Sequence, residues 1–216
     1  MTGPIVVINP NSNVMVTEGL DAVLELFRLP GGPVIECLTL AGGPFGIESQ
    51  LDSDSVILPL AQLIESRRDA GAFVIACYSD PGIDTCRSVT RRPVFGIQES
   101  GVLSAMARAD QFGVLAITEG SIARHRRFMA RMGVLGRLAG EIALNISVAE
   151  SARGDDAFAK LVEVGQELKT RGAGVVILGC AGMARHRAGL ETELGVPVID
   201  PTQAAVAMAM GTLLAG

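Results

Sequence analysis

The chain has 216 residues, of which 49% are hydrophobic and 19% are charged, and its formal net charge is −5. This composition supplies ample apolar material for a core and excludes disorder. The negative balance argues against a nucleic-acid surface or an anionic membrane surface, because both need positive patches. The longest apolar stretches, at residues 175–184 and 204–215, are too short to span a bilayer. We expect no signal peptide, and therefore a cytoplasmic protein with four free cysteine thiols.

Scarce residue types argue against several cofactors. The two lysines, Lys160 and Lys169, lie in one polar segment, so a pyridoxal Schiff base is not expected. The cysteines and the two histidines show neither CxxC nor HExxH spacing, which argues against a zinc site. No glycine-rich phosphate-binding motif is present. We therefore expect no metal and no cofactor.

Strand-like apolar runs alternate with helical patterns along the chain, which is typical of an α/β fold with parallel sheets. Several of the runs are continuously apolar, as expected when helices cover both faces of a sheet. Capping residues predict helices that begin after Ser12, Asp80, Ser121 and Asp200. In chain order, the expected strands are residues 4–8, 34–38, 72–76, 94–97, 112–117, 175–178 and 196–199.

An internal repeat indicates two similar halves. Residues 71–77 and 172–180 each read as a buried strand that ends in a cysteine, and a Pro-Val pair follows each cysteine at nearly the same distance. We expect residues 1–98 and 99–216 to form two pseudo-symmetric α/β halves, each with a parallel sheet flanked by helices, around a shared cleft. The last helix, at residues 202–215, is expected to pack back on the first half.

Two cysteines, Cys77 and Cys180, occupy equivalent points of this repeat. Ligands of open α/β sheets bind beyond the carboxyl ends of the strands, so pseudo-symmetry would place the two thiols on opposite walls of one cleft. The helix that follows each cysteine favours a thiolate and directs free N–H groups into the cleft. One thiolate could then remove a proton from a carbon while the other thiol donates one to the opposite face. The alternative is that both are small buried hydrophobes, which is how we interpret Cys37 and Cys86.

Four motifs, at residues 9–12 (Asn-Pro-Asn-Ser), 76–82, 93–99 and 178–183, together resemble the Asp/Glu/hydantoin racemase superfamily. The resemblance covers nearly the whole chain and is strongest to the hydantoin and allantoin racemase branch. It implies a two-half α/β fold, proton transfer by the paired cysteines, no cofactor, a small-molecule substrate and a homo-oligomer.

The residues after the two cysteines differ from those of the amino-acid racemases of this superfamily. Those enzymes usually carry Asn-Thr and Thr-His at these positions, where this chain has Tyr78-Ser79 and Ala181-Gly182. Free glutamate and aspartate are therefore disfavoured. A 5-substituted hydantoin or an allantoin-like ring, with its own carbonyl and N–H groups, suits a site of backbone amides and neutral side chains. We expect these four residues to bind the substrate.

Other candidate binding residues follow the first strand of each half. Asn9, Asn11 and Thr118 could hydrogen-bond a ring carbonyl and N–H, although a turn and a helix cap would use the same residue types. The loop at residues 41–47 is either a lid that excludes water or an ordinary surface loop. The Arg-rich run at residues 124–131 is expected to be a solvated or subunit-facing surface.

Two other classes of function remain open. The same thiols could serve a maleate-type isomerase or an arylmalonate-type decarboxylase, although the latter usually needs a single cysteine. The cleft could also belong to a non-catalytic sensor that binds a small molecule without transforming it.

Overall fold

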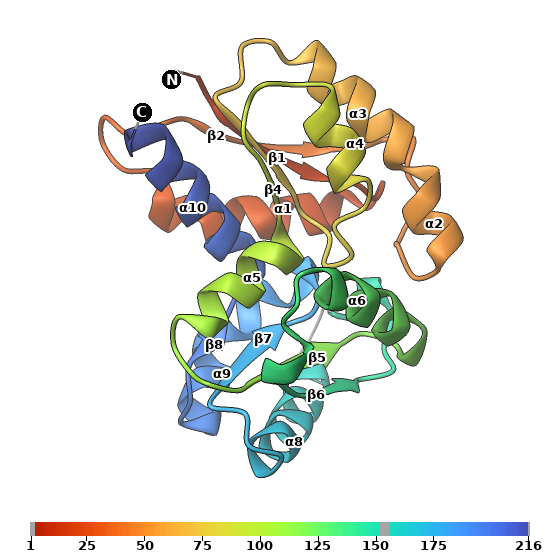
Figure 1. The fold of residues 1–216 in the computed structure, drawn as a ribbon, viewed down its shortest axis with the longest axis vertical. Coiled ribbons are helices and arrows are strands. Elements are labelled where there is room, and N and C mark those ends of the chain that lie inside the picture. Colours follow the sequence, from red (N-terminus) through yellow and green to blue (C-terminus); the bar gives the residue numbers. More distant parts are fainter. Residues whose placement is uncertain (1–2, 152–155, 216) are drawn as a thin grey trace.

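Two parallel β-sheets, each flanked by helices, form the two lobes of the chain (Figure 1). The computed structural model describes residues 3–151 and 156–215. The strand order is β2-β1-β3-β4 in the first sheet and β6-β5-β7-β8 in the second, so the two lobes repeat one topology. The strands are β1 (Ile5–Asn9), β2 (Ile35–Thr39), β3 (Ala72–Ile75), β4 (Val94–Gly96), β5 (Phe112–Ala116), β6 (Leu138–Ala143), β7 (Val175–Leu178) and β8 (Val198–Ile199). The predicted α/β fold with two similar halves is confirmed.

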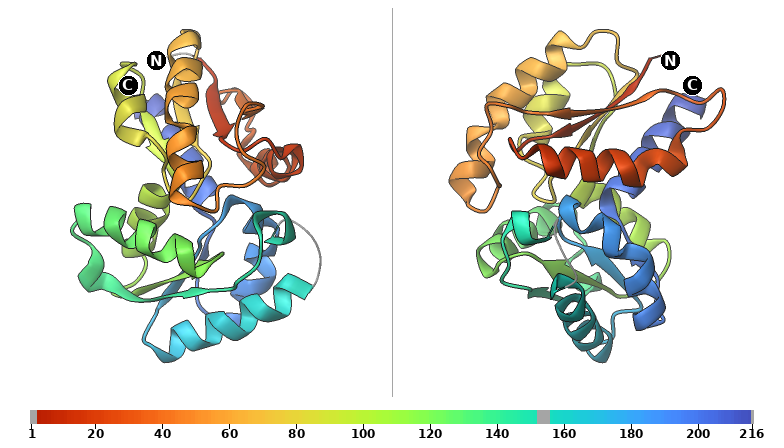
Figure 2. Two further views of the ribbon diagram at one scale, coloured as in Figure 1. Left: turned by 90° about the vertical axis from the view of Figure 1, so that its right-hand side faces the viewer. Right: turned by 180° about the vertical axis from the view of Figure 1, so that it is seen from behind.

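Helices connect successive strands and cover the sheets (Figure 2). Within the described part of the chain, no helix combines the length and the apolar character that crossing a membrane requires. The α-helices are α1 (Val14–Leu24), α2 (Gln50–Ser55), α3 (Ile57–Ser66), α4 (Ile83–Ser88), α5 (Ile97–Met106), α6 (Glu119–Arg131), α7 (Val148–Ser151), α8 (Asp156–Thr170), α9 (Arg187–Leu194) and α10 (Pro201–Ala215). Short 3₁₀ helices lie at η1 (Glu25–Phe27), η2 (Leu135–Arg137) and η3 (Ala181–His186).

The central strands of both sheets are buried along their whole length. Every residue of β1, β3, β5 and β7 is buried, which explains why these segments read as continuous apolar runs. The predicted bounds of these four strands differ from the observed bounds by no more than one residue at either end. The strand β6 was not predicted from the sequence.

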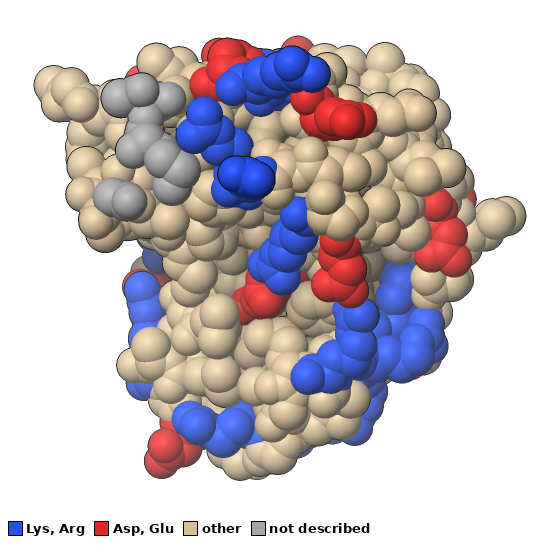
Figure 3. All heavy atoms as spheres, turned by 45° about the horizontal axis from the view of Figure 1, so that its top comes forward, with Lys and Arg blue, Asp and Glu red and all other residues tan. Residues whose placement is uncertain are grey.

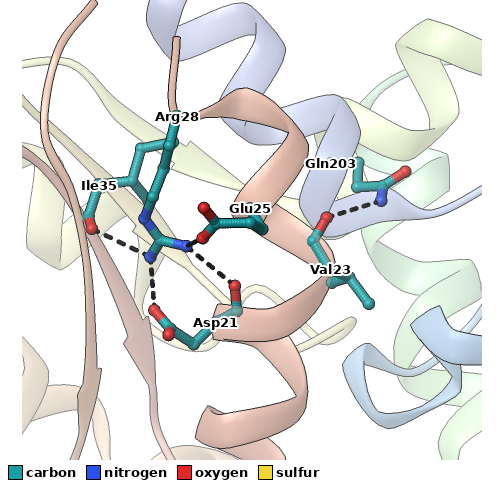
Figure 4. A network of polar contacts seen from close by, with 6 residues as sticks. All are labelled: Asp21, Val23, Glu25, Arg28, Ile35 and Gln203. Carbon is teal, nitrogen blue, oxygen red and sulfur yellow. Dashed lines mark hydrogen bonds and ion pairs between the residues drawn. The ribbon is translucent and has the colours of Figure 1, made fainter. Parts of the chain in front are cut away.

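Helix α10 begins in the second lobe and returns to the first, where it packs against β3, β1 and β4. Its start is defined by Asp200, whose carboxylate accepts the N–H groups of Thr202 and Gln203. The side chain of Gln203 donates to the carbonyl of Val23 at 3.1 Å and so joins α10 to α1 (Figure 4). Helix α5, which spans the predicted boundary between residues 98 and 99, contacts both β4 and β7. The position of that boundary stays a prediction.

The end of α1 is held against β2 by one arginine (Figure 4). Arg28 donates to the carboxylates of Asp21 and Glu25 and to the backbone carbonyls of Asp21 and Ile35. These contacts fix the C-terminal end of α1 to the sheet, and the N-terminal end of the same helix lies beside the site described below.

Two of the predicted helix caps are wrong by a few residues. Asn13, not Ser12, caps α1, because its side-chain oxygen accepts the N–H of Met15. Helix α6 begins after Thr118, and Ser121 lies inside its first turn, where its hydroxyl donates to the carbonyl of Thr118. Both errors arise because several cap-forming residue types stand close together in each loop.

Asp80 caps a different helix from the predicted one. Helix α4 begins after Gly82, whereas the Asp80 carboxylate accepts the N–H groups of Gln98 and Glu99, both at 2.9 Å, at the start of α5. A Cβ on Gly96 would lie 2.2 Å from this carboxylate, so only glycine fits there. Burial raises the pKa of Asp80 to about 7. Asp80 thereby fastens the turn after β3 to the first turn of α5.

Candidate functional site

The carboxyl ends of strands from both sheets meet at one small cavity of about 40 Å³. Cys77, which follows β3, and Cys180, which follows β7, both line this cavity. The two cysteines that stand at equivalent points of the sequence repeat are therefore brought together in space. Five of the other predicted binding residues also line the cavity: Asn11, Tyr78, Ser79, Thr118 and Ala181.

The thiol of Cys77 lies beside hydrogen-bond donors and a positive charge. Burial raises its pKa to about 11, and the nearby sulfur of Cys180 acts in the same direction. The backbone N–H of Ser79 and the guanidinium of Arg124 oppose this shift, because both stabilise the thiolate. The wall at Cys77 can therefore hold a negative charge on sulfur once the proton has been removed.

The thiol of Cys180 has its own set of partners. Its Sγ accepts the N–H of Gly182 at 3.4 Å and lies 3.7 Å from the hydroxyl of Ser151. Burial raises its pKa, whereas these two hydrogen bonds lower it. Gly182 thus contacts the sulfur and does not line the cavity. A Cβ on Gly179 would lie 2.4 Å from the carbonyl oxygen of Leu115, so the residue before Cys180 must be glycine for β7 to keep its place beside β5.

The structure separates the two predicted asparagines. The side chain of Asn9 is fully buried, and its Nδ2 donates to Asn11 Oδ1 and the Asn13 carbonyl at 3.1 Å and to Thr17 Oγ1 at 3.0 Å. Asn9 therefore does not line the cavity, whereas Asn11 does. The hydrogen bond from Asn9 to Asn11 fixes the orientation of the Asn11 side-chain amide, which a ligand in the cavity would meet.

Tyr78 packs into the wall of the cavity next to His125. The two rings meet edge to face, with centroids 5.0 Å apart. Burial raises the pKa of Tyr78 well above its usual value, and its hydroxyl has no hydrogen-bond partner among the described residues. Tyr78 therefore contributes to the wall of the cavity, and its hydroxyl is buried and neutral.

Helix α6 contributes two cavity residues that the sequence analysis placed on a surface. Arg124 and His125 are only 8% and 2% exposed, whereas Arg126 and Arg127 are exposed as expected. His125 Nδ1 lies 2.6 Å from Oε1 of Glu141, which projects from β6. The helical spacing of buried residues along α6 could have revealed this face, because positions three and four apart share one side of a helix.

The loop after β2 reaches from the first lobe to the second across the cavity. Ile47 and Glu48 line the cavity, and Glu48 Oε1 accepts the N–H of Val148 at the start of α7 at 3.2 Å. The loop is also tied to its own lobe, because the carbonyl of Pro44 accepts the N–H of Ser12 at 2.9 Å. Whether residues 41–47 act as a lid stays a prediction.

Charged side chains of both signs gather along the junction between the two lobes (Figure 3). In the described ranges, no three His, Cys, Asp or Glu residues are grouped so that they could hold a metal ion. The chemistry that the cavity offers is thus that of two thiols, neutral hydrogen-bonding groups and a few charges.

Comparisons with known proteins give consistent results. The family model for Asp/Glu/hydantoin racemases matches residues 5–209. The hydantoin racemase of Paenarthrobacter aurescens is 34% identical over 221 residues, which cover 98% of this chain and 92% of that protein. The hydantoin racemase of Pseudomonas sp. (strain NS671) is 32% identical over 207 residues, covering 94% and 83%. The solved structure of the allantoin racemase from Klebsiella pneumoniae matches with a TM-score of 0.92 and 31% identity, covering 99% of this chain and 88% of that one.

Proposed function

This chain belongs to the Asp/Glu/hydantoin racemase family and is an isomerase, and on that premise we propose that it racemises a 5-substituted hydantoin or an allantoin-like compound. The observation that carries the proposal is that Cys77 and Cys180 line one cavity from the two lobes. The hydantoin and allantoin racemases among its relatives support the substrate class.

The mechanism that we propose uses the two sulfur atoms in turn. One thiolate takes the proton from C5 of the ring, so that an S–H bond forms as the C–H bond breaks and the electron pair moves onto the ring carbonyl. The thiol on the opposite side then gives its proton to the other face of C5. Ser79 and Gly182 each direct a backbone N–H at one sulfur, which stabilises whichever cysteine is the thiolate. Exchange of protons with water restores the starting state.

Neutral groups in the same cavity support binding of a ring. Asn11 from the first lobe and Thr118 from the second can hydrogen-bond a ring carbonyl and N–H. A carbonyl that accepts such hydrogen bonds stabilises the negative charge that develops when C5 loses its proton. No cofactor is needed for these steps.

Deuterium exchange tests this function directly. In deuterated water, the protein should incorporate deuterium at C5 of a hydantoin or of allantoin while the optical rotation falls to zero. Glutamate and aspartate should not exchange. Proton NMR on a panel of single enantiomers, with polarimetry in parallel, measures both events.

Three results would contradict the proposal. Exchange of free amino acids alone, without exchange of hydantoins or allantoin, would indicate an amino-acid racemase of this family. A covalent substrate adduct on Cys77, detected by mass spectrometry, would indicate a maleate-type isomerase. Tight binding of a hydantoin without any exchange would indicate a sensor.

The rate should also depend on pH in a defined direction. Because burial raises the pKa of Cys77 to about 11, the thiol form predominates at neutral pH and the thiolate fraction increases with pH. We expect kcat/KM to rise by about tenfold per pH unit from neutral pH to about pH 10. A hydantoin methylated at N3 should be used as the substrate. It lacks the ionisable imide N–H, so ionisation of the substrate does not contribute to the pH dependence of kcat/KM. A rate independent of pH over this range would contradict the thiolate mechanism.

We also propose that the protein is cytoplasmic and that it forms a homo-oligomer. Two catalytic thiols must remain reduced, which supports a cytoplasmic location. The exposed apolar side chains of Phe45, Leu51 and Leu58, around α2 and α3, support self-association into a homo-oligomer. Sedimentation of the purified protein tests the assembly.

A further inference from the structure

Arg124 is a buried cation that has no carboxylate partner among the described residues. The residue is only 8% exposed, and its Nε donates a hydrogen bond to the hydroxyl of Ser79 at 2.8 Å. Arg131, two turns further along α6, differs because it is exposed and pairs with Asp84. Burying a charge is costly unless a counter-ion accompanies it. The structure therefore calls for an anion beside Arg124.

The acidic groups nearby are already engaged elsewhere. Hydrogen bonds from Ser49, the N-cap of α2, are the main cause that lowers the pKa of Asp52. The charge of Arg124 acts in the same direction, but Asp52 forms no ion pair with it. Glu48 lines the same cavity, but its Oε1 accepts the N–H of Val148. Neither carboxylate forms an ion pair with Arg124, so its guanidinium has no such partner among the described residues and lies at the wall of the cavity that holds Cys77.

We infer that Arg124 binds a carboxylate on the substrate, so that this enzyme acts on hydantoins with an acidic substituent at C5. The inference rests on the proposed function and narrows its substrate class. A guanidinium presents parallel N–H donors that match the two oxygens of a carboxylate. Arg124 thereby sets the direction in which the substituent points, while C5 stays between the two thiols.

An alternative role for Arg124, stabilisation of the Cys77 thiolate, predicts a different result. Its charge lowers the pKa of Cys77, so Arg124 could act only by stabilising that thiolate. In that case, every substrate would benefit equally from Arg124. A substrate anchor instead favours carboxylate-bearing substrates alone.

The test compares 5-(carboxymethyl)hydantoin with its uncharged analogue, 5-(carbamoylmethyl)hydantoin. These two molecules have nearly the same shape and differ in charge. We expect the wild-type protein to prefer the carboxylate in kcat/KM by about 10- to 100-fold, the usual size of a hydrogen-bonded charge pair. Arg124→Gln should abolish this preference. The matched control is Arg126→Gln, which removes the same charge from an exposed position of the same helix and should keep the preference.

Calorimetry separates failure of the inference from failure of the proposed function. A racemic mixture undergoes no net change during racemisation, so its affinity can be measured on the active protein. A carboxylate preference in affinity without exchange at C5 would support the anchor and contradict the racemase. Racemisation with no carboxylate preference in the wild-type protein would overturn the anchor, and this result needs no variant.

Two further outcomes decide the role of Arg124. If Arg124→Gln slows both substrates by one factor and shifts the pH dependence of Cys77 alkylation upward, Arg124 serves the thiolate and the anchor is wrong. If Arg124→Gln does not fold, Arg124→Lys keeps the charge but loses the paired donors. The preference should then fall only in part, and an undiminished preference would contradict paired binding.

Discussion

Replacing either Cys77 or Cys180 with serine should lower the rate of racemisation by about 10²- to 10⁴-fold, the usual contribution of a positioned acid or base. A serine hydroxyl is a much weaker acid than a thiol, so it supplies neither the base nor an effective proton donor at neutral pH. The change removes one sulfur atom and keeps the small polar side chain. Loss of optical rotation from each enantiomer of the substrate measures the effect.

The two variants should differ in which enantiomer still exchanges its proton. Each cysteine faces one side of C5, so the thiol that remains can still remove the proton from the enantiomer whose C–H bond points toward it. We expect isotope exchange without inversion, and on opposite enantiomers in the two variants. Such complementary behaviour is specific to two bases on opposite walls, since a general loss of structure would suppress both enantiomers alike.

The control is Cys37→Ser, because Cys37 is a free cysteine in β2 outside the cavity. It should racemise both enantiomers at the wild-type rate. Full activity in both Cys77→Ser and Cys180→Ser would refute the mechanism. So would retention of exchange on the same enantiomer in the two variants, because a single base would then suffice.

The sequence predicted the central strands well and missed one at an edge. Strands β1 and β5 are buried on both faces, so their side chains are apolar without interruption and the signal is strong. Strand β6 lies at the edge of the second sheet, with most of its residues only partly buried. Its Leu138-Ala139-Gly140-Glu141 start gives neither a continuous apolar run nor a clean alternation, and glycine weakens the strand signal further.

The site was predictable where topology decided it and not where side-chain contacts did. Cys77 and Cys180 follow corresponding strands of a repeat, and parallel strands place such positions at one edge. By contrast, Asn9 and Asn11 stand two residues apart, and only the hydrogen bonds of the loop determine which one meets the cavity. The buried role of His125 depends on Glu141, which lies on the strand that was missed.

Removing the carboxylate of Glu141 should destabilise the protein by about 1–3 kcal/mol, the usual cost of leaving the buried partner of a hydrogen bond unsatisfied. The side chains of Glu141 and His125 are 0% and 3% exposed, and their 2.6 Å contact joins β6 to α6. In Glu141→Ala, the Nδ1 of His125 loses this partner, and the space left by the side chain adds the cost of a cavity. Urea unfolding followed by far-UV circular dichroism measures the free energy of unfolding.

Glu141→Gln should cost less, because the amide keeps the volume and one oxygen that can accept a hydrogen bond. The control is Glu163→Ala on the exposed side of α8, which should change the free energy of unfolding by no more than about 0.5 kcal/mol. If Glu141→Ala were as stable as this control, the pair would not hold β6 to α6. Because the ring of His125 supports Tyr78 at the wall of the cavity, any shift of α6 in Glu141→Gln should appear as a higher KM before the fold is lost.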